Sequence, residues 1–179
     1  MNGEKKEGFN RFALKIIIPL IFLGVVLGIW GLKNSNAGFA SEGSPNFDFA
    51  LHVTESLEIE QLKSYGLPII IDFGADSCIP CKEMAPVLKE LNEELQGRAI
   101  VKFVDVWKYK ELAKGYPINL IPTQVFIDAE GKPYKPKDPD AMQMNLYTLR
   151  DSEEHVFTTH EGSLSKEQLL VILEEMGLT

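Results

Sequence analysis

The sequence predicts an α/β protein with a mixed central sheet flanked by helices, preceded by an N-terminal transmembrane or signal segment. Three observations indicate this class. Short apolar runs bounded by Pro and Gly recur along residues 47–179, as is typical of buried strands. Stretches with apolar residues three and four positions apart separate these runs, which is the period of amphipathic helices. One long uncharged run, Ile16–Leu32, precedes them and fits no soluble core.

The N-terminal region has the pattern of an export signal. Residues 1–15 are basic and are expected to stay in the cytoplasm. As a helix, residues 16–32 would span about 26 Å, so they are predicted to be a signal anchor in the membrane, or a signal peptide cleaved near Ala37 or Ala40. The positive-inside rule then places residues 34–179 outside the cytoplasmic membrane, on a single-pass anchor or as an exported, periplasmic protein.

Charge and cysteine content narrow the function. Residues 34–179 carry a net charge of −11, against +3 for residues 1–33, and an acidic domain is a poor partner for nucleic acid. The length fits one ordinary domain. The chain has two cysteines, Cys78 and Cys81, three positions apart, a spacing that indicates redox chemistry or metal binding and not a structural disulfide framework.

The predicted elements alternate between strands and helices after a small, polar tether at residues 33–46. In chain order they are an edge strand at 47–51, a helix within 55–65, a strand at 69–73, a helix from 78 to about 96, a strand at 99–107, a short helix at 111–115, strands at 123–128 and 155–160, and a helix at 165–176. Ser165 and Gln168 are spaced as a capping box for the last helix.

Residues 132–153 form an insertion where a tight hairpin would suffice. Its first half is rich in Pro and Lys, and its second half predicts an extra strand within 142–150. Two interpretations remain open, an additional hairpin at the sheet edge or a surface that binds a partner.

The chemistry is expected where the strand at 69–73 gives way to a helix. Cys78 falls at the helix N-terminus, where free backbone N–H groups and the helix dipole favour a thiolate, so it is predicted to be the nucleophile. Cys81, one turn further on, is predicted to be the resolving thiol. Zinc sites use the same Cys-x-x-Cys spacing, so metal binding stays open on this motif alone.

The segment from Asp72 to Lys82 resembles the active site of the thioredoxin family, and residues 47–179 resemble its order of elements. The resemblance implies a thioredoxin fold, dithiol–disulfide oxidoreductase activity in cell redox homeostasis, and no cofactor beyond a redox-active Cys78–Cys81 disulfide. It also implies that Asp72 is the family's buried acid, which exchanges a proton with Cys81 through water.

Ile121-Pro122-Thr123 resembles the cis-proline loop of the same family. The resemblance implies a cis Pro122 beside the disulfide. It further implies that substrate contacts Ile79 and Pro80 between the cysteines, and Ile121 and Thr123 around the proline.

The chain departs from the thioredoxin pattern at several positions. Ser77 stands where thioredoxins typically have Trp, which makes the rim of the site more polar. Lys102 lies one place off a family lysine near the buried acid, with Phe103 at the matching position, so Lys102 is given no role. Trp107 is expected to pack in the core.

Direction of electron flow is predicted from the residues between and beside the cysteines. Ile79-Pro80 adds neither His nor positive charge, and Ile121 is more similar to thioredoxins than to oxidants, so a reductant is expected. Its substrates would be disulfide-containing exported proteins or apocytochrome c, and an exported reductant implies a membrane electron donor of the DsbD or CcdA type.

Three alternatives stay open from sequence alone. The first is a disulfide-forming oxidant, and the second is an inactive adaptor that binds through the insertion. The third is a copper- or zinc-handling protein that adds one of His52, His155 or His160 to the cysteines, although lone surface histidines would explain all three.

Overall fold

A computed structural model describes residues 47–179 of the 179-residue chain. The predicted cytoplasmic segment, anchor and tether, residues 1–46, lie outside the described residues. Within residues 47–179, no helix combines the length and the apolar character that a membrane crossing requires.

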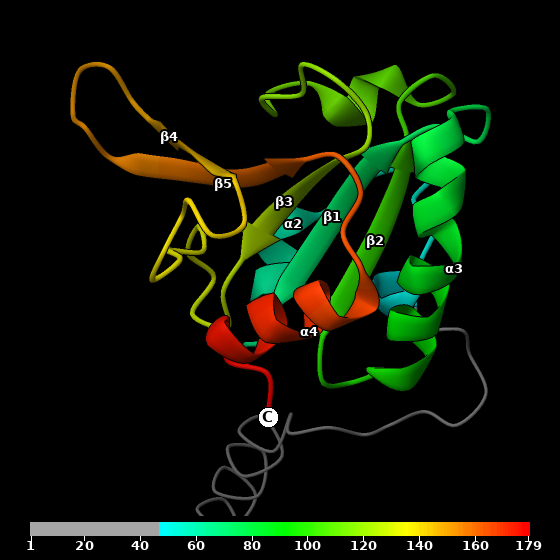
Figure 1. Cartoon of the computed structure of the whole chain (residues 1–179), viewed down its shortest axis with the longest axis horizontal. Coiled ribbons are helices and arrows are strands. Elements are labelled where there is room, and N and C mark those ends of the chain that lie inside the picture. The colour runs from blue at the N-terminus through cyan, green and yellow to red at the C-terminus, as the bar shows by residue number, and fades with distance from the viewer. Residues whose placement is uncertain (1–46) are drawn as a thin grey trace, which may run out of the picture. The chain divides into compact units, whose positions relative to one another are not determined.

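A five-stranded mixed sheet forms the centre of residues 47–179, as predicted (Figure 1). Its strands are, in chain order, β1 (Ile69–Gly74), β2 (Ile100–Asp105), β3 (Thr123–Ile127), β4 (Met144–Thr148) and β5 (His155–Glu161). Their spatial order is β2-β1-β3-β5-β4, and only the β1–β2 pair is parallel. Every residue of β1, β2 and β3 is buried, which explains why these strands are apolar runs without alternation.

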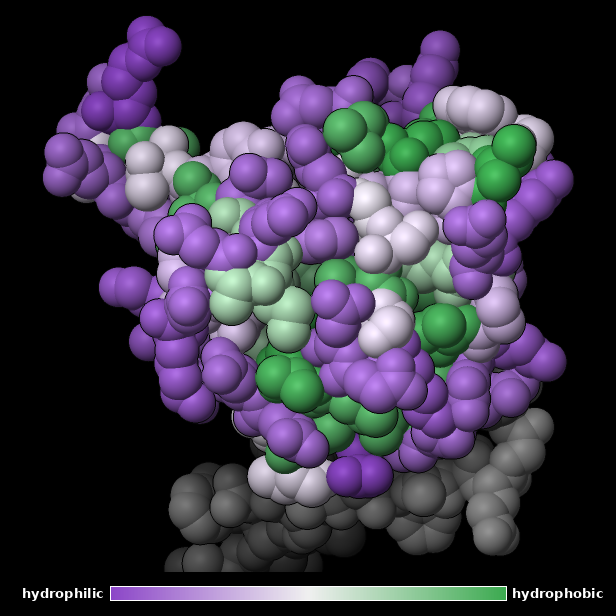
Figure 2. Space-filling model, viewed as in Figure 1, coloured by the Kyte–Doolittle hydropathy of each residue, from purple (hydrophilic) through white to green (hydrophobic). Residues whose placement is uncertain are grey.

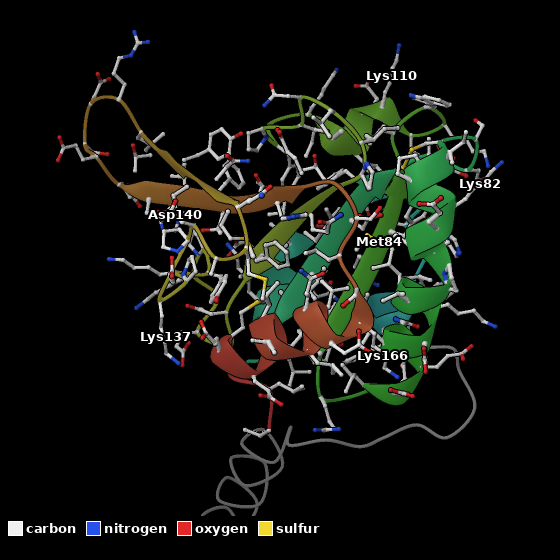
Figure 3. The ribbon with its side chains drawn as sticks, viewed as in Figure 1. Lys82, Met84, Lys110, Lys137, Asp140 and Lys166 are labelled. Carbon is white, nitrogen blue, oxygen red and sulfur yellow. A yellow bond between two sulfur atoms is a disulfide. The ribbon has the colours of Figure 1, made fainter. Side chains whose placement is uncertain are left out.

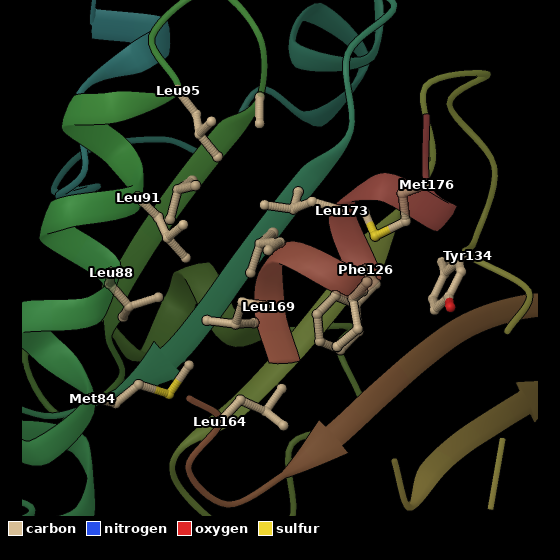
Figure 4. Packing of buried hydrophobic residues seen from close by; sticks show 14 of the residues in the cluster. Met84, Leu88, Leu91, Leu95, Phe126, Tyr134, Leu164, Leu169, Leu173 and Met176 are labelled. Carbon is tan, nitrogen blue, oxygen red and sulfur yellow. The ribbon is translucent and has the colours of Figure 1, made fainter. Parts of the chain in front are cut away.

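Helices cover both faces of this sheet. Helices α3 (Ile79–Glu94) and α4 (Lys166–Glu175) lie on one face, and α2 (Ile59–Lys63) and the 3-10 helix η2 (Lys110–Ala113) belong to the other. Figure 4 shows the α3/α4 layer, in which leucines of both helices belong to one cluster with Phe126 of β3, and Phe126 lies next to α4. Burial of this apolar surface is the main stabilising contribution, at about 25 cal/mol per Å².

The two long helices begin where the sequence predicts. Cys78 is the N-cap of α3, and its side chain accepts a hydrogen bond from the Cys81 backbone N–H. At α4, Ser165 and Gln168 form the predicted capping box: the Ser165 hydroxyl accepts from the Gln168 N–H at 3.3 Å, and the Gln168 side chain accepts from the Ser165 N–H at 2.9 Å. Such a cap contributes about 1 kcal/mol of stability.

The expectation of an edge strand at 47–51 was wrong. Residues Phe47–Phe49 form a 3-10 helix, η1, and the segment joins the sheet through a single parallel bridge between His52 and Phe103. In a strand, these backbone carbonyls would accept hydrogen bonds from the neighbouring strand. Here a side chain donates to them instead: Lys102 Nζ lies 3.0 and 2.7 Å from the Phe47 and Ala50 oxygens. The helix predicted within 55–65 is also shorter, because α2 starts only at Ile59.

The insertion supplies an extra strand, as one of the two interpretations expected. Strand β4 pairs antiparallel with β5 and forms the sheet edge (Figure 1). Inside it, Met144 is buried against the core, while Leu146 is 42% exposed. The loop before it is tied to the sheet by Tyr134, which is buried and whose N–H donates to the Phe126 carbonyl.

Candidate active site

The two cysteines form a disulfide at the start of α3. In Figure 3, the labelled Lys82, in the first turn of α3, marks this end of the helix. It lies at the same edge of the molecule as Lys110 of η2. The Cys81 N–H lies 3.3 Å from Cys78 Sγ, so the free amides of the helix terminus point at that sulfur. Cys78 is half-buried, whereas Cys81 is only 2% exposed. Of the two sulfurs, the one of Cys78 is therefore the more accessible to a substrate.

The proline loop lies beside the disulfide. The Ile121–Pro122 bond is cis, as the resemblance implied, and the Ile121 carbonyl oxygen lies 3.9 Å from Cys78 Sγ. The Pro122 carbonyl accepts the N–H of Gly162 from the segment after β5. Thr123 is fully buried and its hydroxyl donates to the Leu120 carbonyl at 2.8 Å, so its side chain shapes the loop and does not face a substrate.

Three large apolar side chains are exposed on the segments that carry or adjoin the site. Ile79 is 72% exposed, Trp107 62% and Leu120 47%. The expectation that Trp107 packs in the core was wrong, because β2 ends at Asp105 and the side chain falls on the turn that follows. Figure 2 shows hydrophobic patches at the upper edge of the molecule, the edge from which α3 starts in Figure 1. Exposed apolar side chains of this kind are typical of surfaces that bind other polypeptides.

Asp72 lies inside the protein beneath the disulfide. It is fully buried in β1, and burial raises the pKa of its carboxyl to about 7, although a hydrogen bond from Gln124 opposes the rise. A side chain added at Gly74 would lie 3.3 Å from both Asp72 Oδ2 and Cys81 Sγ. The acid oxygen and the sulfur of Cys81 therefore border the same small space beside Gly74.

Two further residues, Gln124 and His160, complete the buried polar group and were missed by sequence reasoning. Gln124 Nε2 donates to Asp72 Oδ1 at 2.7 Å, and Gln124 Oε1 lies 3.0 Å from His160 Nδ1. The interpretation of His160 as a surface histidine was wrong, because the residue is only 8% exposed. The available signal was Gln124 itself, a polar residue inside a strand whose neighbours are all buried.

The remaining polar candidates lie apart from this group. Lys102 pairs in register with Ile71 and not with Asp72. Its side chain therefore projects from the face of the sheet opposite to that of Asp72. Near the rim, Asp105 accepts backbone N–H bonds from Asp76, Trp107 and Lys108, which hold the pKa of its carboxyl below the usual value against the effect of burial.

Among residues 47–179, no histidine bonds to a cysteine. His52 lines the same cavity as Cys81, and its ring packs edge-on against Phe103. His155 bonds within β5, to the Phe157 carbonyl and the Thr158 hydroxyl, and His160 bonds to Gln124. Among residues 47–179, no three His, Cys, Asp or Glu side chains come together as a metal site.

Comparison with known proteins identifies the family. The thioredoxin family model matches residues 51–146, which is more than half of the chain. The thioredoxin of Mycoplasmoides gallisepticum is 36% identical over 81 residues, covering 45% of this chain and 79% of that protein. Thioredoxin Y1, chloroplastic, of Arabidopsis thaliana is 35% identical over 133 residues, covering 73% of this chain and 77% of the relative.

The chain belongs to the thioredoxin family, and the sheet described above is the thioredoxin fold. It is a dithiol–disulfide oxidoreductase, with its redox-active pair in the Cys78–Cys81 disulfide.

Proposed function

We propose that this protein is a membrane-anchored reductant that works outside the cytoplasmic membrane on disulfides of exported proteins or apocytochrome c. A transmembrane carrier of the DsbD or CcdA type would return electrons to it. The proposal for location rests on the basic residues 1–15 and the uncharged run 16–32. The proposal for direction rests on the surroundings of the Cys78 sulfur.

The environment of Cys78 carries the proposal of a reductant. A strongly oxidising site needs a highly stabilised thiolate in the reduced state. Here the sulfur has a backbone N–H from Cys81 and, among the described residues, no hydrogen bond from a cationic side chain. The nearby Lys108 is paired with Asp76 and lies 3.7 Å from Asp105. The helix terminus is thus the main source of thiolate stabilisation, as expected for a low potential.

The redox potential of the Cys78–Cys81 pair tests this proposal. We expect a value between about −230 and −300 mV for the full-length protein equilibrated with dithiol buffers. Ile79→His is a suitable comparison because the side chain is 72% exposed and the change adds a cationic group between the cysteines. It should move the potential towards less negative values. A wild-type value above about −170 mV would instead make the protein an oxidant.

The reaction proceeds in two exchanges, with roles assigned by exposure. The Cys78 thiolate attacks one sulfur of a substrate disulfide, which forms a mixed disulfide and releases the other sulfur as a thiolate. Cys81 then gives its proton to the Asp72 carboxylate and attacks Cys78 Sγ, which frees the second substrate thiol. Two electrons reach the substrate, and the enzyme is left with the Cys78–Cys81 disulfide.

Trapping variants test these roles. Cys81→Ser should accumulate substrates as mixed disulfides on Cys78, and Cys78→Ser should accumulate none, because the remaining thiol is 2% exposed. Equal trapping by both variants would contradict the assignment.

Membrane fractionation tests the location. The protein should stay in the pellet after a carbonate wash, with residues 34–179 open to external protease. A soluble form that starts at Gly38 or Ser41 would contradict the anchor and support cleavage.

A further inference from the structure

Asp72, Gln124 and His160 form one row across the sheet. Asp72 of β1 is the register partner of Gln124 of β3, and Gln124 is the partner of His160 of β5. All three are buried, with exposed fractions of 0, 0 and 8%. The row lies on the face covered by α3, because Gln124 Nε2 also lies 3.3 Å from the sulfur of Met84. It is a continuous polar path inside an apolar layer.

The hydrogen bonds of this row fix the direction of each group. The Gln124 amide nitrogen has two acceptors, Asp72 Oδ1 at 2.7 Å and the Gly162 carbonyl at 3.1 Å. Because the nitrogen takes both, the amide oxygen faces His160 Nδ1, which must then carry a proton. A flipped amide would set its oxygen against the Gly162 carbonyl and against the ionised Asp72 carboxylate. The orientation of Gln124 is therefore determined from both sides.

The two carboxyl oxygens of Asp72 differ in their hydrogen bonds. Oδ1 is occupied by the Gln124 N–H, whereas Oδ2 is buried without a hydrogen-bond partner among the described residues. Oδ2 is also the oxygen on the side of Cys81. The proton that Asp72 gains or loses is thus confined to the oxygen that faces the resolving thiol.

We infer that Gln124 and His160 are positioning residues, which act through Asp72 to keep its Oδ2 directed at Cys81 for the second exchange. This inference rests on the proposed role of Asp72 as the base for Cys81. Gln124 holds the carboxyl through Oδ1, and His160 in its Nδ1–H form holds Gln124.

The groups around Asp72 leave Gln124 as its main polar influence. From α3 it faces Cys81, while Met84 of the same helix contacts Gln124, and from β2 it faces the apolar Phe103. Within residues 47–179, no ion pair includes Asp72. At the other end of the row, burial lowers the pKa of His160 below its ordinary 6.5, against smaller opposing effects of the Gly162 backbone and of Glu161, so the neutral imidazole predominates at pH 7. A neutral imidazole with its proton on Nδ1 is the form that the row requires.

The tautomer of His160 tests the inference without any substitution. Long-range ¹H–¹⁵N correlation on the oxidised, full-length protein should show His160 as the neutral Nδ1–H tautomer at pH 7. A neutral Nε2–H tautomer would overturn the inference, because Gln124 would then have no donor for its amide oxygen. The measurement involves no substrate, so it is independent of whether the proposed function holds.

Titration of the Asp72 carboxyl, followed by ¹³C NMR, tests the effect on the acid. Gln124→Met keeps the length of the side chain but removes the N–H bond to Oδ1, so the midpoint should rise by about one pH unit from its wild-type value. His160→Leu should cause a smaller rise, and His160→Asn should restore the wild-type midpoint because its amide can donate from the place of Nδ1.

Thr159→Val is the matched control for these variants. Thr159 is also buried on β5, but it precedes His160 and so points to the other face of the sheet. Its variant should leave the Asp72 midpoint unchanged. A Gln124→Met protein that titrates like wild type would overturn the inference, and the tautomer of wild-type His160 decides the matter should that variant not fold.

Discussion

Two buried charged residues on adjacent strands differ in how completely their polar atoms are bonded. Lys102 of β2 is 3% exposed and donates to two backbone carbonyls, those of Phe47 and Ala50. Asp72 of β1 is fully buried, yet only one of its oxygens accepts a hydrogen bond. Burial lowers the pKa of Lys102 to about 8 and raises that of Asp72 to about 7.

The polar atoms of Lys102 are used in hydrogen bonds of the fold, whereas within residues 47–179 Asp72 keeps one oxygen free. The ammonium of Lys102 donates its hydrogen bonds to carbonyls of segment 47–50. These bonds hold the segment against the sheet, where an edge strand was expected. The free oxygen of Asp72 costs stability, because a buried acceptor without a partner loses its hydration, by about 1–3 kcal/mol. That oxygen faces Cys81, where a proton acceptor is useful. Under the proposed mechanism, the sheet keeps this unfavourable group because Cys81 needs a proton acceptor there.

The largest expected effect is on stability at acidic pH. The Asp72 pKa is about 7 when folded and about 3.9 when unfolded, so its contribution is complete below pH 4 and is lost as pH rises through 7. Over that window the oxidised protein should lose about 4 kcal/mol that Asp72→Asn does not lose. Urea unfolding at several pH values measures the difference. Parallel curves for the two proteins would mean that folding does not raise the pKa of Asp72.

Lys102 should show a smaller effect in an alkaline window. Its folded pKa of about 8 lies below the ordinary 10.5, so its contribution is present above pH 10.5 and is lost as pH falls through 8. Relative to Lys102→Met, the free energy of unfolding of wild type should rise by about 2 kcal/mol as pH increases from 8 to 10.5, after allowance for solvent screening. The same unfolding series tests this. Disulfide exchange should be unchanged in Lys102→Met, and a slower resolving step there would break the contrast with Asp72.

Gly74→Ala should have the smallest effect. The new Cβ would lie 2.9 Å from the ring of Phe103 and 3.3 Å from both Asp72 Oδ2 and Cys81 Sγ. Because the ring edge can shift, we expect a loss of only about 1 kcal/mol in thermal or urea unfolding. The variant also fills the space between acid and thiol, so the resolving step should slow. Wild-type stability together with wild-type resolution would show that this space is not needed.

The sequence predicted the parts of the site that depend on local pattern. Cys78 could be placed at a helix N-terminus because an apolar strand, a short turn and an amphipathic period follow one another in the chain. Gln124 and His160 could not be placed, since their meeting depends on the register of β3 with β5 across a long insertion. Periodicity within a strand reports that a residue is buried, but not which neighbour lies across from it.

The errors in the fold have a similar origin. Segment 47–51 has the alternation of a strand, but the carbonyls of Phe47, Phe49 and Ala50 are taken by side chains distant in sequence, those of Lys102 and of Asn92 in α3. Trp107 was expected inside because of its size, yet the chain turns at Asp105 and leaves the side chain at the rim. In both places tertiary contacts override a local preference.

In the proposed mechanism, Asp72 serves as the base for Cys81 and does not act on Cys78. A stopped-flow experiment with a chromogenic aromatic disulfide separates the two exchanges, because each releases one coloured thiol. Asp72→Asn should leave the first release unchanged and slow the second by about 10²-fold near neutral pH. Wild type should show a second release that rises with pH around a midpoint near 7, the pKa of Asp72. A second release in Asp72→Asn as fast as in wild type across this range would contradict the account.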